Sequence, residues 1–116
     1  MKKSVSILDA QSGAVIIPNA CIAETAWERT VGLLGKSVLS DGEGMLLPKT
    51  SSIHTFFMRF PIDAVFLSAE GVILKISPAP PWRMRLCLGA AMTLEIPFEN
   101  ARKHSLREGQ QLLFKR

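Results

Sequence analysis

The sequence of 116 residues contains no tyrosine and only two cysteines and two histidines. Cys21 and Cys87 could form one disulfide, but their number and their apolar neighbours do not indicate a disulfide framework. We therefore expect reduced thiols in the core of a cytoplasmic protein. The histidines and cysteines also show no recognised metal-binding spacing, such as paired cysteines or a His-Glu pair on a helix. We expect no metal site and no cofactor.

Long apolar runs are missing as well. An export signal needs about 7 to 15 uninterrupted apolar residues, whereas Asp9, Gln11 and Ser12 interrupt the N-terminal run after Leu8. No other stretch approaches the roughly 18 apolar residues of a membrane-spanning helix. The sequence therefore predicts a protein without membrane association.

Acidic residues are scarce in the second half of the chain. Residues 59–116 carry nine basic and five acidic side chains and hold the whole formal charge of +4. The basic residues are scattered, whereas a nucleic-acid surface needs a dense basic stripe with interleaved aromatic residues. We expect no nucleic-acid partner. Arg83 and Arg85 are a local exception, because they follow a stiff proline-rich connector at 77–81 and suit a phosphate or carboxylate.

The length and the 47% apolar content fit a single domain over residues 1–116. A helix is predicted at 25–34, where Thr25 and Glu28 form a capping box. Alternating or branched apolar residues predict short strands, and 97–104 is a possible short helix. The strands are expected at 5–7, 14–17, 45–47, 53–58, 64–67, 72–76, 91–96 and 111–114. The predicted fold is mainly β, an antiparallel β-sandwich or partly closed barrel with one short helix.

Four ordered blocks carry a family resemblance. They are RTVGLL at 29–34, EGML at 43–46, HTFFMRFPIDAVF at 54–66 and LEIP at 94–97. With them the chain resembles the DUF192 family of bacterial and archaeal proteins over about residues 25–114. The resemblance implies a single mainly β domain, jelly-roll-like or sandwich-like, whose activity is uncharacterised. The sequence departs from the family pattern at Phe98 and Glu99, where a small residue and a glycine are usual.

The third block also contains the candidate site. His54, Met58 and Asp63 lie within ten residues across a proline turn, and an imidazole oriented by a carboxylate is a usable base or ligand. Two structural roles compete with this interpretation. Asp63 could cap the turn at 60–62, and His54 could be a satisfied interior histidine.

These residues support three functional hypotheses. The first is a binding module for an anionic small molecule or a protein segment, using His54, Met58 and Asp63 with Arg83 as the charge partner. The second is an enzyme in which His54 and Asp63 form an acid-base pair beside Arg83 or Arg29 as an anion stabiliser. The third is a structural or interaction domain whose strand edge recruits a partner.

Overall fold

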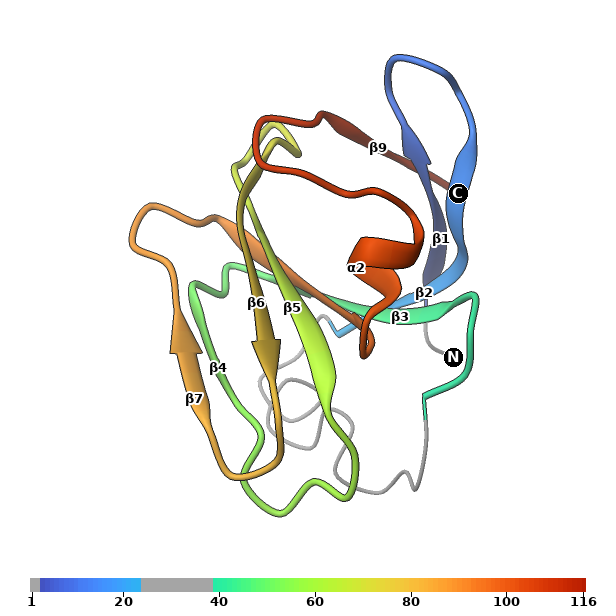
Figure 1. Ribbon diagram of the computed structural model, residues 1–116. Helices are drawn as coiled ribbons and strands as arrows, with labels where there is room; N and C mark the ends of the chain where they lie inside the picture. Colours follow the sequence, from blue (N-terminus) through green and yellow to red (C-terminus); the bar gives the residue numbers. More distant parts are fainter. Residues whose placement is uncertain (1–2, 24–38) are drawn as a thin grey trace.

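A computed structural model describes residues 3–23 and 39–116 and shows a curled sheet with a small second sheet beside it (Figure 1). The helix predicted at 25–34 lies outside the described residues. The described elements are β1 (Ser4–Asp9), β2 (Val15–Ile22), β3 (Glu43–Pro48), β4 (Ser52–His54), β5 (Ile62–Leu67), β6 (Ile73–Ala79), β7 (Met84–Leu86), β8 (Met92–Pro97), α2 (Asn100–Lys103) and β9 (Leu112–Lys115).

The large sheet has the strand order β6-β5-β8-β3-β2-β1-β9 and curls into a half-barrel. Its neighbours are antiparallel except β2 and β3, which run parallel. The two ends of the sheet approach each other at a bridge between Val72 and Gln111. There Ile73 donates its N–H to Gln110 and Leu112 donates to Gly71, each at 2.9 Å. The mainly β prediction is confirmed in its partly closed barrel form.

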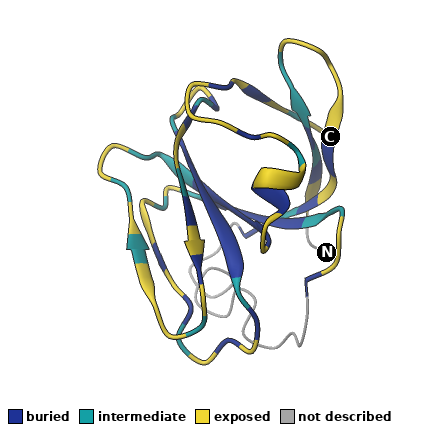
Figure 2. Ribbon diagram, in the orientation of Figure 1, coloured by how far each residue is buried: buried dark blue, intermediate teal, exposed yellow. Residues whose placement is uncertain are grey.

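Two apolar clusters occupy the two faces of the large sheet. Within β5, Val65 and Leu67 belong to the first cluster, which fills the curl and includes Ala101 of α2. The alternate residues Ala64 and Phe66 belong to the second cluster, which also includes residue Ile53 of the small sheet. Because successive strand residues face opposite sides, β5 is buried throughout (Figure 2). The layers therefore run from α2 through the large sheet to the small sheet of β4 and β7.

The structure corrects several predicted elements. The strand predicted at 53–58 ends at His54, and the chain turns at residues 56 and 57. The proline-rich stretch 77–81, predicted as a stiff connector unsuited to a sheet interior, begins within β6, which includes Pro78 and ends at Ala79. Since β6 is the edge strand of the large sheet, a proline there need not break the pairing. The short helix predicted at 97–104 is present as α2, whereas Pro97 belongs to β8.

The cysteines also differ from expectation. Cys21 and Cys87 are free thiols, as predicted, but both are partly exposed rather than buried in the core. Within residues 3–23 and 39–116, no helix has the length and apolar character that crossing a membrane requires.

Candidate functional site

Thr55 joins the two loops at one end of the small sheet. Its side chain is fully buried, and its hydroxyl donates to the Pro80 carbonyl at 2.5 Å and accepts from the Arg83 N–H at 2.9 Å. Its backbone N–H donates to the Arg83 carbonyl, and its carbonyl accepts from the Trp82 N–H. Thr55 therefore holds residues 80–83 against the end of β4. The Thr55 N–H bond continues the register of β4 and β7 by one position, and the ladder ends there because the Arg83 N–H donates to the Thr55 hydroxyl instead of the Thr55 carbonyl.

His54, the last residue of β4, and Arg83, just before β7, lie at the same end of the small sheet. His54 pairs with Met84 in the register of β4 and β7 and is exposed, so it is not the interior histidine of the alternative interpretation. Its Nδ1 accepts a hydrogen bond from the Phe56 N–H at 3.2 Å, and its ring stacks on Phe56 with centroids 5.0 Å apart. Arg83 is exposed and donates to the carbonyl of Trp82. Both predicted residues are therefore exposed at this end of the small sheet.

A row of exposed apolar side chains follows β7 and its two ends. Trp82 is 54% exposed and Leu88 is 88% exposed, with Met84 and Leu86 more than half exposed between them. These residues alternate along the chain, so within β7 Met84 and Leu86 point away from the second cluster. Phe57 from the neighbouring loop adds a side chain that is 69% exposed. We call these five residues, Phe57, Trp82, Met84, Leu86 and Leu88, the docking face.

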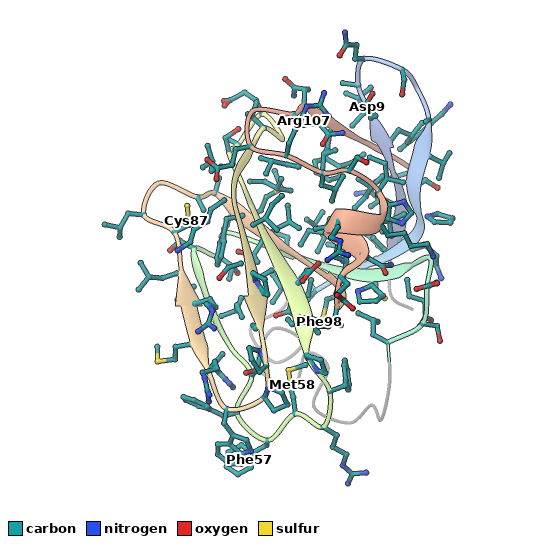
Figure 3. The ribbon with its side chains drawn as sticks, viewed as in Figure 1. Asp9, Phe57, Met58, Cys87, Phe98 and Arg107 are labelled. Atoms are coloured by element: carbon teal, nitrogen blue, oxygen red, sulfur yellow. The ribbon has the colours of Figure 1, made fainter. Side chains whose placement is uncertain are left out.

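The aromatic end of the docking face is held in an unusual backbone conformation. Phe57 has φ 68° and Trp82 has φ 66°, the left-handed region that bulky residues rarely adopt. Their rings lie 4.6 Å apart between centroids, and Phe57 stands at one end of the small sheet while Cys87 lies near the other (Figure 3). Each such residue costs about 1–3 kcal/mol. The fold therefore keeps Phe57 and Trp82 in strained backbone conformations although both side chains are more than half exposed.

The polar residues of β7 bond to the backbone at its edge. Arg85 donates from Nε to the Pro78 carbonyl at 3.1 Å and from Nη1 to the Met84 carbonyl at 2.8 Å. Lys75 of β6 donates to the Leu86 carbonyl at 3.0 Å. Cationic side chains that occupy the carbonyls of an edge strand hinder pairing with a further strand. Arg83 and Arg85, which were predicted to suit a phosphate or carboxylate, therefore already donate to backbone carbonyls of this chain.

The chain segments that carry the docking face contain charges of one sign. The segments 49–62 and 71–94, which contain the small sheet and its connections, have no Asp or Glu. They contain Lys49, Arg59, Lys75, Arg83 and Arg85. An apolar surface within this purely basic region favours a partner of negative charge.

Asp63 lies on a different side of the molecule from His54. It has the same orientation in β5 as Val65 and Leu67, toward the first cluster and α2. Its side chain is 3% exposed, and its Oδ2 accepts from the Ala101 N–H at 3.0 Å. Burial raises the pKa of Asp63, while the backbone N–H groups of Ala101 and Glu99 lower it by a smaller amount. Asp63 therefore caps the segment entering α2, not the predicted turn at 60–62.

The four predicted site residues do not gather at one place. His54 and Arg83 lie at the end of the small sheet, and Met58 is buried in the second cluster beneath it (Figure 3). Asp63 faces the opposite side of the large sheet. Within the described ranges His54 and Asp63 share no hydrogen bond, so the acid-base pair of the enzyme hypothesis is not formed here.

The docking face was missed at the sequence level although a signal was present. Apolar residues alternate at positions 82, 84, 86 and 88, which is the period of a strand. That pattern would normally place the apolar side inward, and only the structure shows it outward.

Two further observations concern charged groups. Within residues 3–23 and 39–116, no three His, Cys, Asp or Glu side chains lie close enough together to hold a metal ion.

Glu95 of β8 is buried on the same face as its cross-strand neighbours Met45 and Ala64, both members of the second cluster. Burial raises the pKa of Glu95 to about 7. This glutamate belongs to the fourth block of the resemblance.

Fold and surface define a small mainly β protein with a curled sheet, a flanking two-stranded sheet and an exposed apolar face. The family model of DUF192, described as an uncharacterised ACR, matches residues 7–114, and the chain belongs to this family. A UPF0127 protein from Thermococcus sibiricus is 29% identical over 89 residues, which are 73% of this chain and 58% of that protein. The match thus spans less than two thirds of that relative.

Solved structures show the same fold. A proposed transcription regulator from Sinorhizobium meliloti 1021 superposes with a TM-score of 0.84 at 20% identity, covering 98% of this chain and 94% of its own. A protein of unknown function from Novosphingobium aromaticivorans has a TM-score of 0.77 at 19% identity, covering 97% and 84%. At these identities the similarity establishes the fold alone.

Proposed function

We propose that this protein is a binding module that takes an acidic, partly apolar segment of another protein on its docking face. The observation that carries the proposal is the outward row from Trp82 to Leu88, with Phe57 beside it, inside a region free of acidic residues. Clustered exposed apolar side chains on a soluble domain mark interaction sites, and Trp is enriched among the residues that dominate binding energy.

The shape of the docking face favours a protein segment over a small anion. Positions 82 to 88 extend over at most roughly 20 Å at strand spacing. The face therefore offers apolar contacts along a length that several residues of an extended partner can follow. A small anion would need a convergent set of donors, whereas Arg83 and Arg85 each donate to a carbonyl of this chain.

The charge pattern specifies the partner further. An acidic segment lying along β7 places carboxylates near Arg83, which bonds to Trp82, and Lys75, which bonds to Leu86, while its apolar side chains contact the row. Such complementary charge raises the association rate and disfavours basic partners. Since the β7 carbonyls of Met84 and Leu86 accept from cationic side chains, recognition relies on side chains rather than on strand addition.

A peptide-display selection tests this function. A library of ten-residue peptides with random acidic, basic and apolar content is selected on the immobilised wild-type protein. The matched variant is Phe57→Asn/Trp82→Asn/Met84→Gln, in which asparagine tolerates the left-handed backbone of the first two positions. The control variant is Val15→Ser/Leu113→Ser, which removes exposed apolar side chains of β2 and β9.

We expect wild type and control to enrich peptides that combine Asp or Glu with Leu, Phe or Trp, and the matched variant to enrich none of them. Equal enrichment by the matched variant, or enrichment of basic peptides, would contradict the proposal. Enrichment of short acidic peptides lacking apolar residues would favour an anion site around Arg83 instead.

The proposal also covers the extent of the domain and the cellular compartment of the protein. We propose that residues 1–116 act as one domain in the cytoplasm. The family match over residues 7–114 supports the first part. The free thiols Cys21 and Cys87 support the second, because reduced cysteines are usual in a reducing compartment.

A further inference from the structure

A cavity of about 510 Å³ lies between α2 and the edge of the large sheet, away from the docking face. Its wall is largely apolar and includes Ile76 of β6, Phe98 from the turn before α2, and Leu106 after it. Phe98 stands beside the start of β5 in Figure 3, where Ile62 pairs with Pro97. Cavities of this volume and composition are typical of sites for small organic molecules.

The polar side chains of the cavity wall are two carboxyl groups, one guanidinium group and the Ser105 hydroxyl. Asp63 lines it as a carboxyl group that is 3% exposed, and Glu99 and Arg102 lie at its rim. With both carboxylates ionised, these three side chains sum to one negative charge. The Asp63 oxygens accept from two backbone N–H groups, and a carboxylate offers about four acceptor positions. Asp63 therefore retains capacity for a further donor in an environment with little water.

We propose that this cavity binds a small organic cation, an amine with an apolar or aromatic body. The ammonium group donates to the buried carboxylate of Asp63, and the body packs against Ile76, Phe98 and Leu106. A charge-assisted hydrogen bond in a site of low exposure is among the stronger polar contacts. Burial opposes the charged form of Asp63, and a bound ammonium offsets that cost. The proposal is independent of the docking face.

Three probes of similar size test the charge preference. They are 2-phenylethylamine, 2-phenylethanol and 3-phenylpropionate, each titrated into the ¹⁵N-labelled protein at pH 7 while amide shifts are followed. We expect saturable shifts at Ala101, Ser105 and Leu106, and an affinity for the amine about tenfold above that for the alcohol. The carboxylate should bind most weakly. A carboxylate that binds best, equal affinities, or no saturable shifts around the cavity would overturn the proposal.

Two variants test whether the probes bind in the cavity rather than elsewhere on the protein. Asp63→Asn should reduce amine binding about tenfold and leave alcohol binding unchanged. If Asp63→Asn does not fold, Arg102→Gln decides, because Arg102 is exposed and its removal takes a like charge from the rim. It should tighten amine binding, and weaker amine binding would contradict the proposal. Leu113→Ser, at an exposed position of β9 outside the cavity wall, serves as the control and should leave all three affinities unchanged.

Discussion

The burial of Glu95 makes the stability of the folded protein depend on pH. Its side chain is 5% exposed, and no group among residues 3–23 and 39–116 forms a hydrogen bond with it. The pKa of about 7 in the folded state exceeds the ordinary value of 4.5, so the folded protein binds the proton more tightly than the unfolded chain. Stability is therefore unaffected below pH 4.5 and falls as the pH rises toward 7.

Glu95→Gln removes this titration. The variant should gain stability relative to wild type between pH 4.5 and pH 7, by about 3 kcal/mol in total, with parallel curves above that range. Urea unfolding at a series of pH values measures the difference. Glu108→Gln, at an exposed position, is the control and should follow wild type. A constant difference between Glu95→Gln and wild type over this range would show that the carboxyl is not destabilised by burial.

Thr55 is the residue on which the aromatic end of the small sheet depends. Thr55→Val keeps the volume but removes the hydroxyl, leaving the Pro80 carbonyl and the Arg83 N–H without this partner. We expect a loss of about 1–3 kcal/mol in the free energy of unfolding and faster amide exchange at Trp82 and Arg83. Thr55→Ser keeps the hydroxyl and should retain slow exchange at both amides. Unchanged exchange in Thr55→Val would refute this role.

At the scale of elements, the sequence predicted most strands but not β7. Residues 84–86 follow three prolines in five positions, and their strand pairs with β4 rather than with a neighbour in the large sheet. Tertiary hydrogen bonds from Thr55 fix this pairing, which local propensity does not encode. The placement of Asp63 was hidden for a similar reason, because its bonding partner Ala101 is 38 residues away.

The turn between β5 and β6 provides a test of how the barrel closes. Gly71 has φ +88°, and a Cβ there would lie 2.7 Å from the Leu112 carbonyl oxygen of β9. Gly71→Ala should therefore lower the free energy of unfolding by about 3 kcal/mol through strain and displacement of that strand. Gly13→Ala is the matched control, since Gly13 has φ +78° but nothing within 4 Å of a Cβ. It should cost about 1 kcal/mol. Equal costs in urea unfolding would show that contact with β9 is unimportant.

At the scale of the whole molecule, the layers separate two surfaces. The large sheet and the second cluster lie between the docking face and the cavity beside α2. His54 and Asp63 therefore lie on opposite sides of the large sheet although they are only nine positions apart in the sequence. The sequence supported a mainly β fold and the family, and it drew attention to Arg83 and the segment around it. It could not show that β7 carries its apolar side outward, because alternation alone does not reveal which side is buried.

The central claim is that the docking face binds an acidic, apolar protein segment. Its most direct test is the affinity of the strongest selected peptide, measured by calorimetry for wild type, Phe57→Asn/Trp82→Asn/Met84→Gln, and Val15→Ser/Leu113→Ser. Removing central aromatic anchors should weaken binding at least about tenfold, while the control remains within about twofold of wild type. Equal affinities for wild type and the docking-face variant would contradict the claim.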